Sequence, residues 1–139
     1  MDVGLIDRIN YIEKESFNVV WKKEIYMEMK KNPLYDIFTI YEGDLLVGFA
    51  VTTIALDEAE IIRVAVDKSY RNKGYGRNLI CNIISNLKIK NITKIFLEVR
   101  ESNVSAISLY KKAGFYEINI RKNYYPDNLE NAIIMQLEL

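Results

Sequence analysis

The sequence predicts one mixed α/β (α+β) domain, in which a central sheet carries helices on its faces. Strand-like runs follow one another in the first half of the chain, and later they alternate with stretches whose apolar residues recur at helical spacing. The 139 residues suffice to bury a core without disulfides or metal, and no repeat or linker divides them. We therefore expect a single domain over residues 1–139.

The first half should form two helices and then three strands. Apolar residues recur at helical spacing from Leu5 onward, and a second helical stretch runs roughly from 20 to 31, where Asn32-Pro33 ends it. Its apolar stripe, which we expect to pack in the core, consists of Trp21, Ile25 and Met29. Runs rich in β-branched and aromatic residues predict strands at 35–41, 45–56 and 60–66.

Short polar and glycine-containing segments mark the connections between these strands. Glu42-Gly43-Asp44 predicts a three-residue turn of a bulged hairpin, and Asp57-Glu58-Ala59 predicts the next turn. Gly48 lies inside a strand-like run, where it predicts a bulge or a close approach of another chain segment.

The second half should alternate helices and strands. The clearest apolar stripe predicts a helix from about Gly76 to Asn91, and a strand buried on both faces follows at 95–99. Ser102 and Asn103 are suitable N-caps for another helix, which should end at Gly114. The remaining segments predict strands at 115–122 and 132–139, joined by a polar loop.

Composition excludes several classes of function. The 19 basic and 19 acidic side chains cancel, so no overall field attracts nucleic acid or an anionic membrane. Cys81 is the only cysteine and there is no histidine, which excludes an internal disulfide, a cysteine-rich zinc site and histidine-based nucleophilic mechanisms. Because neither a signal-like start nor a long apolar run occurs, we expect a cytoplasmic protein. The lack of histidine and of further cysteines removes most transition-metal sites, so we expect no bound metal.

The stretch from Ile61 to Asn78 predicts an anion-binding site. A buried strand ends at Val66, a basic loop with Gly74 and Gly76 follows, and the unpaired N–H groups of the next helix would point at an anion. The loop lacks the lysine of a Walker motif and the third glycine of a dinucleotide-binding motif. From these residues alone, a phosphate loop and a plain strand-to-helix turn both remain open.

Two longer motifs resemble those of the GCN5-related N-acetyltransferase (GNAT) family. They read Y-R-N-K-G-Y-G-R after V-A-V-D, and L-E-V-R-E-S-N-V-S-A-I-S-L-Y-K-K-A-G-F. The resemblance covers nearly the whole chain and is weakest near its beginning. It implies a mostly antiparallel twisted sheet of about six to seven strands with one splayed parallel pair. It also implies direct transfer of an acetyl group from acetyl-CoA to an amine in a ternary complex.

Within this family, three segments are similar to the RimI-type ribosomal-protein alanine N-acetyltransferases. They read D-E-A-E-I-I-R-V-A-V-D, L-E-V-R-E-S-N, and I-R-K-N-Y-Y-P-D-N followed by E-N-A-I-I-M-Q-L. Two departures stand out. Asn18-Val19-Val20 precedes Trp21 where the family usually has a Pro-Trp pair, and Arg63 stands where enterobacterial relatives have a small polar amide. We expect both departures to alter the acceptor pocket and to leave the transfer chemistry unchanged.

The resemblance implies which residues bind the donor. The backbone of Val64, Ala65 and Val66 would pair with the pantetheine arm, and N–H groups there would polarise the thioester. Asn103 would also reach the pantetheine. The pyrophosphate would be held by the loop and helix start, which comprise Arg71, Asn72, Lys73, Gly74, Tyr75, Gly76 and Arg77.

Two residues are candidates for proton transfer. Glu98 lies in an apolar run where burial should raise its pKa, as a general base requires, although an ion pair with Arg100 or another cation also fits. The resemblance places the proton acceptor at Glu98 and the proton donor to the departing thiolate at Tyr110. Core packing explains Tyr110 equally well. Full proton transfer from tyrosine to thiolate costs roughly 2 kcal/mol in water, so a hydrogen bond to sulfur would serve nearly as well.

The acceptor is constrained by its own pKa. At pH 7 an α-amine is about 14% neutral and a lysine only about 0.04%, so a single carboxylate base suits a peptide N-terminus better. The resemblance to the RimI-type enzymes implies acetylation of the N-terminal alanine of a ribosomal protein, and a monomer is the favoured oligomeric state. It also implies that Trp21, Tyr124 and Tyr125 shape the acceptor pocket, whereas a solvated loop over a sheet edge fits the two tyrosines equally well. The alternatives are a small-molecule amine or a lysine side chain as acceptor, and a non-catalytic acyl-CoA-binding module.

Overall fold

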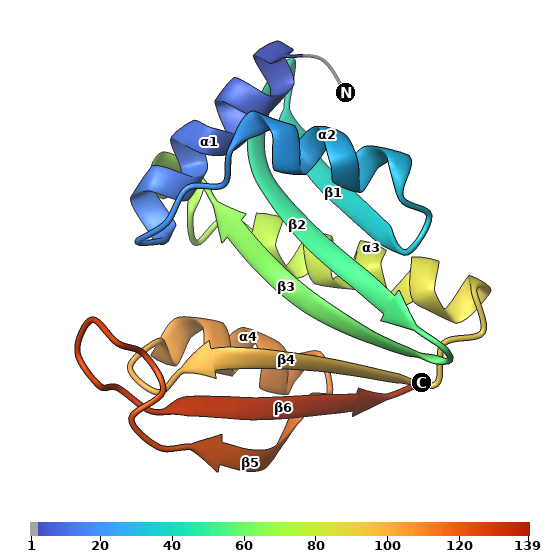
Figure 1. The fold of residues 1–139 in the computed structure, drawn as a ribbon, viewed down its shortest axis with the longest axis vertical. Helices are drawn as coiled ribbons and strands as arrows, with labels where there is room; N and C mark the ends of the chain where they lie inside the picture. Colours follow the sequence, from blue (N-terminus) through green and yellow to red (C-terminus); the bar gives the residue numbers. More distant parts are fainter. Residues whose placement is uncertain (1–2) are drawn as a thin grey trace.

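The computed structural model describes residues 3–139 and shows a single twisted sheet with helices on both faces (Figure 1). The elements are, in chain order, α1 (Val3–Ser16), α2 (Lys23–Lys31), β1 (Tyr35–Glu42), β2 (Leu45–Ala55), β3 (Glu58–Val66), the short 3₁₀ turn η1 (Lys68–Tyr70), α3 (Tyr75–Ile89), β4 (Lys94–Arg100), α4 (Val104–Lys112), β5 (Tyr116–Arg121) and β6 (Ala132–Glu138). None of the helices in this part of the chain is long and apolar enough to cross a membrane.

Within residues 3–139, six strands lie in the order β1-β2-β3-β4-β6-β5. The neighbours β3 and β4 are parallel, and the other pairs are antiparallel. Helices α1 and α2 lie on one face over β1–β3, and α3 and α4 lie on the other (Figure 1). The predicted fold class, with six strands and one parallel pair, is therefore confirmed.

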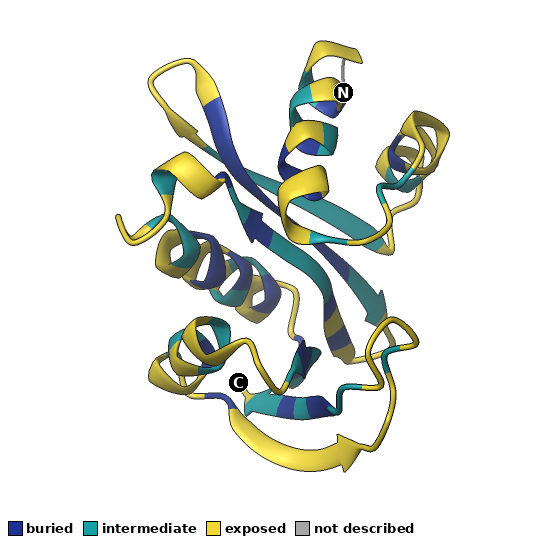
Figure 2. Ribbon diagram, turned by 90° about the vertical axis from the view of Figure 1, so that its left-hand side faces the viewer, coloured by how far each residue is buried: buried dark blue, intermediate teal, exposed yellow. Residues whose placement is uncertain are grey.

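Two clusters of buried side chains form the core, one on each face of the sheet (Figure 2). The larger cluster lies under α3 and α4 and contains Leu79, Ile83 and Leu87 of α3 at helical spacing. The smaller cluster lies under α1 and α2, where Ile9 of α1 and Tyr26 of α2 pack on the sheet. The sheet is therefore covered where the helices lie, and one part of the first face stays accessible.

The predicted stripe of the second helix is wrong in part. Helix α2 begins at Lys23, so Trp21 lies in the preceding loop, and Ile25 is 39% exposed. The buried residue is Tyr26, whose ring packs edge-on against Phe49 of β2 at 6.5 Å between centroids. The large ring fills the space between helix and sheet, and it turns Ile25 outward.

The connections differ from prediction by one or two residues. Gly43 and Asp44 form a two-residue turn, since Glu42 already pairs with Leu45, and the bulge lies farther along at Val47. The next turn consists of Leu56 and Asp57, with Leu56 in the left-handed conformation at φ 57°. Gly48 is confirmed as a close approach, because a Cβ there would lie 2.9 Å from Ile40 Cγ2.

Strand β4 is not buried on both faces. Ile95, Leu97 and Val99 are buried toward α3 and α4, whereas Phe96 and Glu98 are only partly buried on the opposite face. The reason is that α1 and α2 cover β1–β3 rather than β4 (Figure 1). This accessible face of β4 is where the candidate site lies.

Candidate active site

The parallel strands β3 and β4 stay together over only part of their length. Four pairs join them, from Glu58 opposite Lys94 to Ile61 opposite Leu97. At that point β3 contains a bulge, because Ile61 pairs with Thr52 and Arg63 with Val51, which leaves Ile62 extra. The bulge bends β3 away from β4, and the two strands diverge toward their carboxyl ends (Figure 1).

We call the two diverging ends, Val64–Val66 of β3 and Glu98–Arg100 of β4, the splayed segment. Val64, Ala65 and Val66 pair with β2 on one edge, and their other edge no longer pairs with β4. An extended ligand can therefore add to this edge as a strand would. The sequence-predicted pantetheine contacts lie here.

The loop after β3 is shaped by fixed contacts at its start. Asp67 is buried, accepts a hydrogen bond from the Ser69 N–H at 2.9 Å and forms an ion pair with Arg8 of α1. Asn72 and Gly74 then adopt left-handed conformations with φ of 62° and 88°. The loop delivers the chain to the N-terminus of α3 at Tyr75, where the first amides have no partner within the helix.

Gly76 allows this helix end to approach α4. A Cβ at Gly76 would lie 3.2 Å from Leu109 Cδ2 of α4 and 3.9 Å from Val66 Cγ2 of β3. The end of β3, the start of α3 and α4 therefore meet at this glycine. An anion at the helix start would lie next to the splayed segment, as the pyrophosphate and pantetheine of one ligand must.

The basic residues of the loop do not all point the same way. The Arg71 guanidinium donates to the Val66 carbonyl at 3.1 Å and to Ser16 Oγ at 3.0 Å, so it ties the loop to β3 and α1. Lys73 lies over the ring of Tyr70, 5.4 Å from its centroid, and Arg77 is exposed on α3. Asn72 and Lys73 are exposed just before α3 and Arg77 is exposed in its first turn, whereas Arg71 braces the loop.

Glu98 lies on the accessible face of β4, with its side chain 25% exposed. Its Oε1 is 3.6 Å from Arg121 Nη2 of β5, whereas Arg100 pairs instead with Asp127 at 3.1 Å. A hydrogen bond to the Glu98 carboxylate, together with its charge, raises the pKa of Tyr124. The expected burial of Glu98 is therefore only partial, and its nearest cation is Arg121 rather than Arg100.

A second carboxylate, Glu60, belongs to the same site. Glu60 lies opposite Phe96 in the parallel register, so Glu60 and Glu98 share a face of the sheet. Partial burial, and next the charge of Glu98, raise the pKa of Glu60. Both carboxylates line a cavity of about 430 Å³ together with Arg121. The sequence analysis missed Glu60, because only the strand register places it beside Glu98.

Tyr110 lies on the other face of the sheet from Glu98. It is 8% exposed, and its ring packs against Phe115 at 5.9 Å between centroids. Burial raises the pKa of Tyr110 to about 12, so its hydroxyl stays protonated at neutral pH. Because Tyr110 packs with Val99 and Leu97 while Glu98 points the opposite way, the two predicted catalytic groups flank the splayed segment from its two sides.

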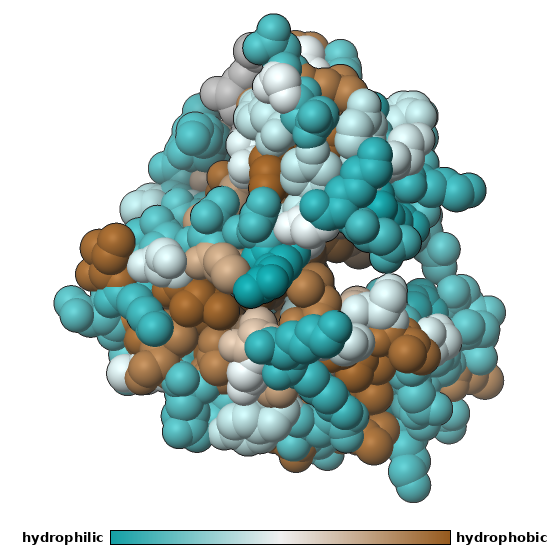
Figure 3. All heavy atoms as spheres, turned by 180° about the vertical axis from the view of Figure 1, so that it is seen from behind, coloured by the Kyte–Doolittle hydropathy of each residue, from teal (hydrophilic) through white to brown (hydrophobic). Residues whose placement is uncertain are grey.

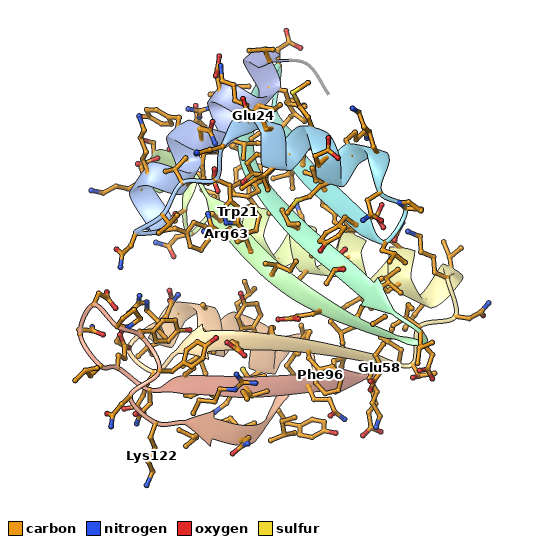
Figure 4. All side chains as sticks on the ribbon, viewed as in Figure 1. Trp21, Glu24, Glu58, Arg63, Phe96 and Lys122 are labelled. Atoms are coloured by element: carbon orange, nitrogen blue, oxygen red, sulfur yellow. The ribbon has the colours of Figure 1, made fainter. Side chains whose placement is uncertain are left out.

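The remaining residues that the sequence analysis assigned to the site are Asn103 and three aromatic residues expected near the acceptor. Asn103 caps α4 by accepting a hydrogen bond from the Ala106 N–H at 3.3 Å, which leaves its side-chain amide N–H₂ as a donor. Tyr125 packs on the Arg100 guanidinium at 3.9 Å and against Tyr124 at 5.1 Å. Trp21 lies in the α1–α2 loop, residues 17–22, at the edge of the upper half that faces the lower half (Figure 4). Seen from behind, the surface is hollowed between these two halves (Figure 3).

Two parallel strands that diverge beside a helix start, with a carboxylate on one face, are the arrangement expected of an acyltransferase with a thioester donor. The model of the acetyltransferase (GNAT) family matches residues 6–115, and the chain belongs to this family. It is an acetyl-CoA-dependent N-acetyltransferase.

Two relatives and one solved structure show which enzymes of this family the chain is similar to. The chain is 37% identical over 131 residues to the [ribosomal protein bS18]-alanine N-acetyltransferase of Escherichia coli K12, covering 93% of this chain and 88% of that protein. It is 38% identical over 131 residues to a putative enzyme of the same name from Bacillus subtilis, covering 94% and 87%. The crystal structure of the E. coli ribosomal-protein-S18-alanine N-acetyltransferase superposes with a TM-score of 0.88 at 34% identity, covering 99% of this chain and 90% of that one.

Proposed function

We propose that the protein transfers the acetyl group of acetyl-CoA to the α-amine of an N-terminal alanine of a ribosomal protein. The similarity to bS18-alanine N-acetyltransferases from two distant bacteria supports this substrate. The observation that carries the proposal is the splayed segment, with Glu98 on one face and Tyr110 on the other. An amine arriving on the Glu98 face and a thiol departing on the Tyr110 side is the geometry that direct transfer requires.

The donor would bind along the unpaired edge of β3 and end at the start of α3. Val64, Ala65 and Val66 offer backbone groups to the pantetheine, and the side-chain amide of Asn103 is a further donor toward it. The first amides of α3, from Tyr75 onward, would hold the pyrophosphate with the residues of the loop, which are Arg71, Asn72, Lys73, Gly74, Gly76 and Arg77. This fit supports acetyl-CoA as the donor.

The transfer step is a direct displacement at the thioester. The acceptor α-ammonium first loses one proton, which Glu98 would take. The neutral nitrogen then bonds to the acetyl carbon, the bond from that carbon to sulfur breaks, and the nitrogen loses its second proton to solvent as the amide forms. Tyr110 would donate a proton or a hydrogen bond to the departing sulfur. Because Glu60 and Glu98 line one cavity, the site favours a cationic acceptor, as an α-ammonium is at neutral pH.

The acceptor pocket would be bordered by Trp21 from the α1–α2 loop and by Tyr124 and Tyr125 from the loop before β6. A protein that modifies a ribosomal protein would act in the cytoplasm. All the residues proposed for the transfer come from one chain, so a monomer would be active.

Acetylation of defined peptides tests the proposal. The protein is incubated with acetyl-CoA and a peptide that carries the N-terminus of the organism's own ribosomal protein, beginning with alanine. We expect release of coenzyme A and one added acetyl group on the N-terminal residue, identified by fragment mass spectrometry. The matched control is the same peptide with a blocked α-amine and an intact lysine, which should not react.

The same experiment distinguishes the alternatives. Turnover of a polyamine or another small amine without turnover of the peptide would assign the protein to small-molecule acetylation. Acetylation of the blocked peptide would point to lysine. Tight binding of acetyl-CoA in calorimetry with no turnover of any amine would identify a binding module.

A further inference from the structure

A buried ion pair joins α1 to β3 beside the acceptor side of the site. Glu13 of α1 is completely buried, and its Oε2 accepts a hydrogen bond from Arg63 Nη1 at 2.5 Å. The same carboxylate accepts from Asn10 Nδ2 at 2.7 Å and from the Trp21 backbone N–H at 3.4 Å. A buried carboxylate that lost its cation would be strongly destabilised, so this pair holds Arg63 in one place.

The Arg63 guanidinium also lies against two aromatic rings. Its central carbon is 4.0 Å from the centroid of the Trp21 ring and 4.4 Å from that of Phe17. Trp21 and Arg63 lie next to each other at the edge of the upper half (Figure 4). A planar guanidinium can contact rings through its faces while its edge bonds a carboxylate, which the ammonium of lysine cannot do.

Both rings belong to the α1–α2 loop, residues 17–22. The loop is held further by Asn10 Nδ2, which donates to the Trp21 carbonyl at 3.0 Å. Arg63 itself follows the bulged Ile62 and precedes Val64, so it lies where β3 leaves β4 and the donor-binding edge begins. The residue therefore connects the acceptor loop to the strand that would carry the thioester.

We propose that Arg63 is a positioning residue, which fixes the Trp21 indole and thereby the α1–α2 loop as a rigid wall of the acceptor site. The inference rests on the proposed function, in that Trp21 borders the acceptor pocket. In this role Arg63 contacts neither the acceptor amine nor the acetyl thioester. This role would affect which acceptors bind, because β3, the strand proposed to bind the donor, would set the position of the α1–α2 loop beside the acceptor.

The test uses Arg63→Gln and Arg63→Lys, with the enzyme otherwise intact. Because Trp21 is the only tryptophan, its fluorescence reports the stacking directly. We expect Arg63→Gln to shift the emission to the red and to increase acrylamide quenching. We expect it to raise the KM for the acceptor peptide about tenfold, the size of effect that loss of a desolvated cation–π contact gives, with the KM for acetyl-CoA changed less than about twofold. Arg63→Lys should fall between, because it keeps the charge and loses the planar stacking.

A matched control removes an ion pair elsewhere. Lys90→Gln breaks the pair with Asp36 between the end of α3 and β1, and it should change neither the fluorescence nor either KM. If Arg63→Gln fails to fold, the double variant Glu13→Gln/Arg63→Gln replaces the charged pair by two amides and provides the same readouts.

Two results would overturn the inference. One is an unchanged Trp21 emission in the folded Gln variant, and the other is an equal rise in the KM for both substrates. If the wild-type protein turns over a different amine, the proposed acceptor fails, but the fluorescence measurement and the KM for that amine still decide the role of Arg63.

Discussion

Glu98 lies between a cation and a second carboxylate. Arg121 is 3.6 Å from its Oε1, and Glu60 shares its face of the sheet and its cavity. The Arg121 guanidinium attracts the Glu98 carboxylate, and partial burial, and next the charge of Glu98, raise the pKa of Glu60. An α-amine is already about 14% neutral at pH 7, so its deprotonation requires less free energy than that of a lysine.

Glu98→Gln should therefore lower kcat/KM for the peptide about 100-fold at pH 7, at the low end of what general bases contribute, while the affinity for acetyl-CoA stays unchanged. The deficit should shrink as the pH rises above about 8, because solution then deprotonates the α-amine. A pH profile of kcat/KM for both proteins measures this. A deficit that stays constant up to about pH 9.5, well above the ordinary pKa of an α-amine, would contradict the role of base.

Glu60→Gln is the matched comparison, because it removes a carboxylate from the same cavity. It should have the smaller effect at pH 7. A larger loss of kcat/KM in Glu60→Gln than in Glu98→Gln would assign the role of general base to Glu60 of β3.

These residues also show how far prediction from sequence extends. Glu98 and Tyr110 could be named as candidates because each stands in a recognisable apolar pattern and in a family motif. Glu60 could not, because its place beside Glu98 depends on the register of two strands that are far apart in the sequence. Arg121 was not predicted for the same reason, since it reaches Glu98 from the neighbourhood of β5 and β6.

At the scale of elements, helices and strands were predictable and their exact turns were not. Apolar periodicity locates α1 and α3, because burial repeats along each helix, and runs of β-branched and aromatic residues locate β1, β2 and β3. The turn at Leu56 escaped prediction, since a leucine in the left-handed conformation carries no turn signal and is accepted only because the strands on both sides fix it. The bulge at Ile62, which opens the splayed segment, likewise has no glycine to mark it.

Gly48 gives a prediction at this scale, because β2 passes closely under its neighbours there. A Cβ at Gly48 would lie 2.9 Å from Ile40 Cγ2 and 3.2 Å from both the Ala65 carbonyl oxygen and Leu79 Cδ1. Gly48→Ala should lower the free energy of unfolding by about 1–3 kcal/mol, measured by urea denaturation. Because Ala65 lies on the donor edge, the KM for acetyl-CoA should also rise.

The control for Gly48→Ala is Gly43→Asn in the β1–β2 turn. Gly43 has a φ of 58°, and a Cβ at this position would meet nothing within 4 Å. Asparagine tolerates this backbone conformation, so the stability and kinetics of Gly43→Asn should match the wild type. Equal free energies of unfolding for Gly48→Ala and the wild type would show that the side chains around Gly48 can shift to accommodate a Cβ without loss of stability.

At the scale of the whole molecule, two halves are joined along a short seam. One half carries β1–β3 with α1–α3, the other carries β4–β6 with α4, and four residue pairs between β3 and β4 connect the sheet across them. The halves also meet on the acceptor side, where Asn18 Nδ2 of the α1–α2 loop donates to Asp127 Oδ2 at 2.9 Å. In the proposed function, the acceptor would therefore enter beside a contact that bridges the two halves.

Asn18→Ala should raise the KM for the acceptor peptide about two- to fivefold and leave the KM for acetyl-CoA unchanged, because a single exposed hydrogen bond is worth roughly 0.5–1.5 kcal/mol. Asp127→Ala should cost more, since Asp127 also pairs with Arg100 at 3.1 Å. If Asn18 acts through Asp127, the double variant should match Asp127→Ala alone rather than the product of the two single effects. Steady-state kinetics of the four proteins measures this, and full additivity would show that the bridge between the halves does not order the acceptor side.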